Sequence, residues 1–481
     1  SPTILIDAET GERVAHFSEL DMSLSTEDDA DRTLMIRPVV RLKDATRYIA
    51  AFRRVVDHDG KPIPPSPVFQ ALRDGSNASC DVSVGRRKEL YADIFARLEK
   101  AGFPRGDLQI AWDYTTASRE NNTSRFLHMR DDALAKVGDL GPEYTIVKVD
   151  ENPNPHIRRR ILGKMKVPLY LDKPEPGGKF VLDAQGLPMQ NGTAEFEFLV
   201  HIPNAATTGT PGALLQNGHG LLGYKTEGQD GYLAEIADGK NCVAFGVDLV
   251  GMAHEDLDSI TNSILGDAGL FKNEVDRQQQ GMLNSLLAMR LMRGRFVQEP
   301  LVQFEGKSAI DPTQRFYRGD SQGGIFGTTY MAVSTDVTRG LVGEPGLPYS
   351  LILNRSADFG FYFILLKGTY HTGRNIQLLW DHLPEDLRAL PEAQFLHNAG
   401  HVARMIGDAV LLLVGGLVLL IDDDDAQVRE RQRAGNPPAH RSSPVGDQDE
   451  SHTQFRDALD LARGGRDCRE TRSRRSGSYP R

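Results

Sequence analysis

The sequence is poor in cysteine and tryptophan, and it carries no excess of positive charge. Its 481 residues include three cysteines, Cys80, Cys242 and Cys468, which lie far apart and lack the spacing of metal ligands. Neither a disulfide framework nor a cysteine metal site is therefore expected. The formal net charge is −10 at pH 7. This balance argues against general nucleic-acid binding, because neutralising phosphates requires a surplus of Lys and Arg.

Long hydrophobic runs are also lacking. The longest, Ala409 to Ile421, has 13 residues, whereas a membrane-spanning helix needs about 20. We therefore expect no integral membrane segment. The chain begins Ser1-Pro2 without a methionine, as it would after removal of a leader, so export to the periplasm or the extracellular space is one expectation.

The length and the changes in composition predict three parts. Residues 1–117 contain short β-like runs separated by polar turns, such as Leu34–Val40 and Tyr48–Phe52, which predict a small β-sandwich. Residues 118–425 form the second part. Residues 426–481 are rich in arginine and hold few large apolar side chains, so we expect this segment to be poorly ordered.

The second part reads as an α/β domain. Residues 193–202 alternate between apolar and polar side chains, as a strand with one buried face does. A buried strand at 213–216 leads into a glycine-rich turn, Asn217-Gly218-His219-Gly220. A helix over 231–237, a strand over 242–247 and a helix over 275–292 follow. This order predicts a mainly parallel sheet flanked by helices.

The segment Gly319-Asp320-Ser321-Gln322-Gly323 fits the pattern G-x-S-x-G. In a nucleophile elbow the serine sits on a strained turn between a strand and a helix, and glycines let neighbouring backbone pass close by. Glycine-rich turns around serine are common, so the pentapeptide alone is equally compatible with a simple tight turn.

Together, the two glycine-rich turns resemble the α/β-hydrolase superfamily of serine esterases and lipases. The resemblance rests on residues 217–220 as an oxyanion loop and on 319–323 about a hundred residues later, and it covers residues 195–370. More narrowly, the chain resembles large bacterial lipase-like proteins with an N-terminal immunoglobulin-like β domain. The segments 47–48, 111–118 and 361–368 carry that similarity.

The resemblance implies roles for particular residues. Ser321 is the expected nucleophile, and the backbone N–H groups of Gln322 and Leu221 are the expected oxyanion hole. His219 is then structural, because the superfamily places its base after the serine. Asp320 is expected to be an elbow residue and not the catalytic acid. No metal or organic cofactor is implied.

The catalytic base and acid should follow Ser321. The favoured base is His452, with His440 second. The favoured acid is Glu392, with Asp408 and the run beginning at Asp422 as rivals. Taken singly, each of these carboxylates is better explained as a solvated surface group.

The sequence thus predicts a hydrolase acting on a small-molecule or lipid ester. The alternative is a non-catalytic binding protein in which the hydrolase domain is degenerate. The oligomeric state is left open by the sequence.

Overall fold

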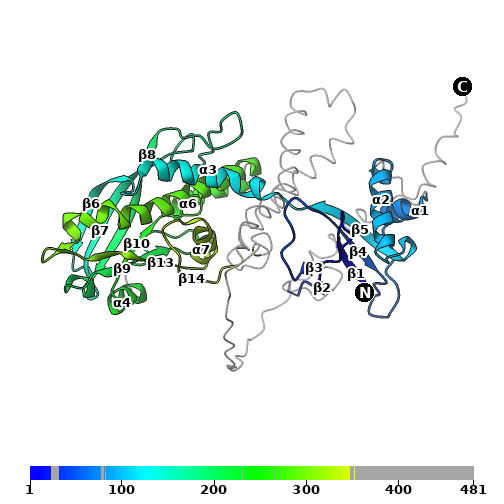
Figure 1. Cartoon of the computed structure of the whole chain (residues 1–481), viewed down its shortest axis with the longest axis horizontal. Helices are drawn as coiled ribbons and strands as arrows, with labels where there is room; N and C mark the ends of the chain where they lie inside the picture. The colour runs from blue at the N-terminus through cyan, green and yellow to red at the C-terminus, as the bar shows by residue number, and fades with distance from the viewer. Residues whose placement is uncertain are drawn as a thin grey trace, which may run out of the picture. The chain divides into compact units, whose positions relative to one another are not determined.

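The computed structural model describes residues 1–22, 32–76, 81, 83–229, 231–265, 267–346 and 352. They fall into two compact units, one over Ser1–Ser118 and one that begins at Arg119. The first unit is drawn in blue shades and the second from cyan to yellow-green (Figure 1).

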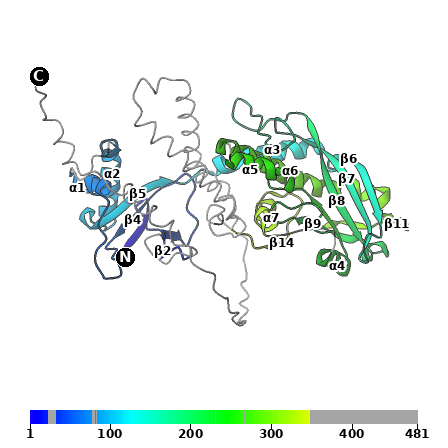
Figure 2. The same ribbon diagram turned by 180° about the vertical axis from the view of Figure 1, so that it is seen from behind.

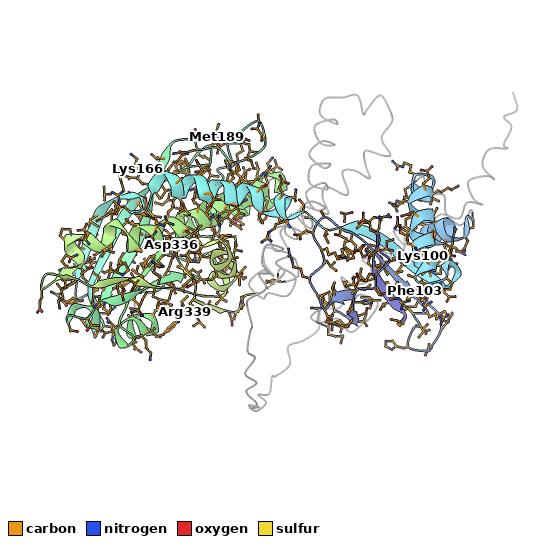
Figure 3. The ribbon with its side chains drawn as sticks, viewed as in Figure 1. Lys100, Phe103, Lys166, Met189, Asp336 and Arg339 are labelled. Carbon is orange, nitrogen blue, oxygen red and sulfur yellow. The ribbon has the colours of Figure 1, made fainter. Side chains whose placement is uncertain are left out.

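The first unit is a small antiparallel sheet with helices packed on it. Strands β1 (Thr3–Asp7), β4 (Arg47–Arg53) and β5 (Leu108–Thr115) pair in the order β1-β4-β5, and β2 (His16–Leu20) pairs with β3 (Leu34–Pro38). Helices α1 (Pro67–Asp74) and α2 (Ser83–Lys100) accompany the larger sheet. Phe103, labelled in Figure 3, follows α2 and is buried in the same core.

The expected β-sandwich is not confirmed in this unit. Ile4 and Ile49 of the sheet share one buried cluster with Phe69 of α1 and with Ile94 and Phe95 of α2. Helices therefore cover the sheet face that a second sheet would cover in a sandwich. The sequence signals of α1 were missed.

The second unit contains a seven-stranded mixed sheet. Its order is β14-β13-β9-β10-β8-β7-β6. The strands are β6 (Glu143–Glu151), β7 (Ile157–Pro168), β8 (Thr193–Pro203), β9 (Gly212–Gly218), β10 (Cys242–Val247), β13 (Ile310–Asp320) and β14 (Gly340–Gly343). Strands β14, β13, β9 and β10 run parallel, whereas β8, β7 and β6 join in antiparallel pairs. The prediction of a mainly parallel sheet holds for the half that contains Ser321.

Helices lie on both faces of this sheet (Figures 1 and 2). They are α3 (Arg119–Val137), α4 (Tyr232–Gly239), α5 (Leu257–Leu265), α6 (Phe271–Arg293) and α7 (Gln322–Val333). Val243 and Phe245 of β10 belong to the main core, which also contains much of α6. Ala244, which points the other way, packs with Ala234 and Ala237 of α4. Alternation along β10 thus separates the face with α6 from the face with α4.

The remaining elements are short. They are the strands β11 (Gln303–Phe304) and β12 (Lys307–Ser308) and the 3₁₀ turns η2 (Arg105–Asp107), η3 (Ala205–Thr207), η4 (His254–Asp256), η5 (Ala268–Leu270), η6 (Arg295–Gln298) and η7 (Pro300–Val302). Within the described ranges, no helix is both long and apolar enough to cross a membrane.

Candidate active site

The site is built where β9, β10 and β13 end, because parallel strands bring their carboxyl ends to one edge of a sheet. Strand β13 runs directly into α7 through Ser321, which has φ 53° and ψ −122°. A residue with a side chain rarely adopts such a conformation, and surrounding contacts must enforce it. The amide of Ser321 donates to Gly343 O at 3.1 Å, which ties the turn to β14.

Two glycines permit the close approach of the elbow to its neighbours. A Cβ atom on Gly323 would lie 2.2 Å from the carbonyl oxygen of Gly218 at the end of β9. A Cβ atom on Gly319 would lie 2.3 Å from the carbonyl oxygen of Gly323. Both distances are shorter than any contact a real side chain makes, so the turn needs glycine at both positions. The pattern G-x-S-x-G therefore has a steric basis in this chain.

Two backbone N–H groups beside Ser321 have no acceptor among the described residues. Gln322 begins α7, and its amide has no intrahelical partner. Leu221 lies in the turn that follows β9, and no hydrogen bond of its amide was found there. These are the two donors that the sequence resemblance implies for an oxyanion hole.

His219 is buried and uses both ring nitrogens. Its Nε2 accepts the amide N–H of Leu249 at 2.8 Å, so its Nδ1 carries the proton and donates to Gly220 O at 2.8 Å. Burial lowers the pKa of His219 below its usual 6.5, which favours the neutral ring. These bonds support the predicted structural part for this histidine and leave no free nitrogen to act as a base.

The side chain of Gln322 joins three segments, a connection that the sequence analysis missed. Its Oε1 accepts the amide N–H of Leu222 at 3.2 Å, and its Nε2 donates to Met252 O at 2.8 Å. The side chain is 4% exposed. Gln322 thus links the elbow to the turns after β9 and β10. Its position after the serine was the only sequence signal, and partners 70 or more residues away cannot be read from the sequence.

Asp320 pairs with a buried arginine. The guanidinium of Arg318 contacts the Asp320 carboxylate and also donates to Asn217 Oδ1 at 2.8 Å and to the hydroxyl of Tyr232 at 2.6 Å. Asp320 is therefore engaged at the base of the elbow, in agreement with its predicted part there.

An apolar cluster borders the same turns. Met252 and Ile260 are buried, and partly buried side chains pack against them: Leu221, Leu222, Phe271 and Phe326. Phe326 lies four residues after Gln322 and so on the same face of α7. The surface beside the two free N–H groups is consequently apolar on this side.

The predicted base and acid lie outside the described residues. This holds for His452 and His440, and for Glu392, Asp408 and Asp422. No hydrogen bond to the hydroxyl of Ser321 was found within the described ranges. In that part of the chain there is also no group of three or more His, Cys, Asp or Glu side chains that could hold a metal ion.

The strand order and the elbow fit an α/β-hydrolase fold. The antiparallel pair of β8 and β10, the parallel run through β9 and β13, and a serine at the junction of β13 and α7 are together the arrangement expected for it. This assignment of the fold rests on the topology and on the backbone at Ser321.

No known family pattern matches the chain, and no curated protein matches it in sequence. Solved structures give low-scoring similarities. Acetyl xylan esterase 1 from Thermoanaerobacterium sp. JW/SL YS485 is 14% identical with a TM-score of 0.31, covering 58% of this chain and 72% of that one. An acetyl xylan esterase from Paenibacillus sp. R4 is 15% identical with a TM-score of 0.30, covering 59% and 75%. A glucuronoyl esterase from Solibacter usitatus is 11% identical with a TM-score of 0.25, covering 45% and 58%. Similarities this weak carry no argument about the activity of this chain.

Proposed function

We propose that the protein is a serine hydrolase of carboxylic esters with Ser321 as its nucleophile. One observation carries the proposal: Ser321 has a positive φ of 53° and a strained backbone at the junction of β13 and α7, against the end of β9. A strained conformation of this kind persists only where neighbouring structure enforces it, and such sites are often functional. Here the strained conformation places the serine at the carboxyl edge of the sheet, beside the turns that follow β9 and β10.

The chemistry follows from the groups around Ser321. Its Oγ attacks the ester carbonyl, and the resulting oxyanion accepts hydrogen bonds from the backbone N–H groups of Gln322 and Leu221. The proposed base takes the proton of Oγ and passes it to the leaving alcohol, and water, activated by the same base, then hydrolyses the acyl-enzyme. His452 is the proposed base and Glu392 the proposed acid, on the sequence resemblance alone. These steps use only protein groups and water.

The apolar cluster beside Leu221 supports an ester with an apolar acyl group, either a small molecule or a lipid. An acyl chain that packs on this cluster would gain roughly 0.8 kcal/mol for each CH₂ group it buries. A longer acyl chain should therefore mainly strengthen substrate binding, until it covers the whole apolar cluster.

The direct test is hydrolysis of p-nitrophenyl acetate and butyrate. Ser321→Ala should reduce the rate to that of the buffer, because the variant lacks the attacking oxygen. Thr329→Ala is the matched control, since it removes a hydroxyl from the same helix about two turns away and should retain the wild-type rate. Wild-type activity in Ser321→Ala would refute the assignment.

A fluorophosphonate probe separates this proposal from the non-catalytic alternative. The probe labels only an activated serine, and mass spectrometry should place the label on the peptide containing Ser321. A folded wild-type protein that takes up no label would favour a binding protein instead.

A further inference from the structure

The turn after β10 contacts both segments that carry the proposed oxyanion donors. In this turn, residues 249–253 (the β10 turn), the amide of Leu249 donates to His219 Nε2 at 2.8 Å. The carbonyl of Met252 accepts the Nε2–H of Gln322 at 2.8 Å. His219 lies two residues before one donor, and Gln322 itself supplies the other. A single turn thus fixes the relative position of both N–H groups.

A buried ion pair anchors the β10 turn. Asp256 is fully buried, and its Oδ2 accepts the amide N–H groups of Gly251 at 2.6 Å and Ala253 at 3.0 Å. Its Oδ1 accepts the Nε–H of Arg277 at 2.5 Å. Arg277, on α6, is 1% exposed and also donates to the carbonyl of Pro174. The carboxylate therefore joins the turn to α6 (Figure 2 shows α5 and α6 side by side).

The packing leaves the β10 turn almost no freedom on its α6 side. Gly251 has φ +92°, and a Cβ atom there would lie 2.4 Å from the amide nitrogen of Gln278. A Cβ atom on Gly281 would lie 2.4 Å from the carbonyl oxygen of Val250. The turn thus packs directly on the backbone of α6 at two points. Because that backbone blocks movement toward α6, a turn that loses its anchor moves toward the active site.

We propose that Asp256 and Arg277 are positioning residues for ester hydrolysis: their ion pair holds the β10 turn where both N–H donors converge on one oxygen. The inference rests on the proposed function. Arg277 also pairs with Glu255, whose side chain is half exposed, so loss of the Asp256 charge leaves the buried guanidinium with only that outer carboxylate and frees the turn from its anchor. Loss of a buried ionic partner is relieved by movement or by the entry of water. A displacement of about 1 Å at an active site is enough to lower a rate by roughly a hundredfold.

The test is the kinetics of Asp256→Asn, which keeps the size of the side chain and removes its charge. Reactive serines are first counted with diethyl p-nitrophenyl phosphate, which releases one p-nitrophenolate for each. We expect kcat per titrated site on p-nitrophenyl butyrate to fall at least about tenfold, with KM changed less than about twofold. Affinity for an alkyl trifluoromethyl ketone, which forms an oxyanion on the serine, should fall in parallel. If the ion pair only stabilised the fold, Asp256→Asn would lower the fraction of protein with a titratable serine and leave kcat per titrated site unchanged.

Asp336→Asn is the matched control. Asp336, labelled in Figure 3, pairs with Arg290 at 2.7 Å and Arg293 at 2.6 Å in the last turns of the same α6. Loss of this second buried pair should lower stability and leave kcat per titrated site unchanged. An equal fall of kcat in this control would overturn the inference.

Two more variants serve if Asp256→Asn does not fold. Arg277→Lys keeps the charge and loses the fixed geometry of the guanidinium, and Gly251→Ala displaces the β10 turn without changing any charge. Both should lower kcat per titrated site and inhibitor affinity. If the wild type has a titratable serine and both variants keep its kcat and inhibitor affinity, this inference is refuted and the proposed function still stands. A wild type without a titratable serine would refute the proposed function as well.

Discussion

Glu274 lies on α6 with its side chain removed from solvent. One carboxyl oxygen accepts a hydrogen bond from Ser259 Oγ, and the other is buried with no hydrogen-bond partner among the described residues. Burial raises the pKa of Glu274 from 4.5 to about 7, and the nearby negative charge of Asp256 adds to that effect, whereas Arg277 and Lys173 oppose it. We expect Glu274→Gln to remove a pH-dependent loss of stability.

The sign follows from proton binding. In the unfolded chain the carboxyl group ionises near pH 4.5, whereas in the folded protein it keeps its proton up to about pH 7. The folded state therefore binds more protons between these values, and its stability falls as the pH rises through that window. A rise of the pKa from 4.5 to about 7 corresponds to roughly 3 kcal/mol, at 1.36 kcal/mol for each pH unit between them. Below pH 4 this loss is absent, and above pH 8 it is complete.

The measurement compares the free energy of unfolding of the wild type and of Glu274→Gln in urea at pH 4 and pH 8. Hydrogen exchange of α6 peptides (Phe271–Arg293) restricts the signal to the second unit. The variant should gain up to about 3 kcal/mol relative to the wild type between the two pH values. Glu235→Gln, an exposed site on α4, is the control and should show no such gain. An equal difference between the wild type and Glu274→Gln at both pH values would refute the reasoning.

Two further results are expected. Gly323→Ala should lower ester hydrolysis by at least about tenfold while circular dichroism shows a folded protein, because the methyl group meets the carbonyl of Gly218 and moves the elbow; full activity would contradict the packing. Since burial lowers the pKa of His219, nitrogen NMR at pH 6.5 should find the ring mainly neutral with its proton on Nδ1, and this group's contribution to stability should decline as the pH falls below 6.5. A His219 signal that titrates at or above pH 6.5 would contradict that conclusion.

Much of the fold of the second unit could be predicted from periodicity. The strand over 242–247 has the predicted bounds, and α6 extends the predicted helix over 275–292 by four residues at its start and one at its end. Strand β7 (Ile157–Pro168) was harder to recognise from the sequence. Arginines at 158–160 hide the start of this strand, because their stems cover apolar surface while their charges reach polar partners.

The N-terminal unit was harder because its helix signals are short. Helix α1 has an N-cap at Ser66, whose side chain accepts the amide N–H of Phe69, a proline at its first position and Gly75 in a left-handed conformation at its end. All three signals are present in the sequence, but these residues were counted within the predicted β-sandwich over residues 1–117. A helix of eight residues shows too few turns for its periodicity to correct that interpretation.

At the site, local patterns located the serine and the turn after β9 but not what holds them. The G-x-S-x-G pattern marks Ser321 because its glycines meet a local steric need. The ion pair of Asp256 and Arg277 joins residues 21 apart in the chain, and the Gln322 bonds span 70 and 100 residues. Such contacts depend on the assembled sheet and leave no spacing signature.

The positive φ of Ser321 has a consequence for folding. Its amide is held by Gly343 of β14, and the following helix rests on Gly218, about a hundred residues earlier in the chain. A peptide containing the elbow alone has neither contact, so its serine relaxes to a negative φ and ordinary reactivity. The proposed nucleophile thus comes into being only when β9, β13 and β14 have all joined, and reaction with a serine probe would report the completion of that half of the sheet during refolding.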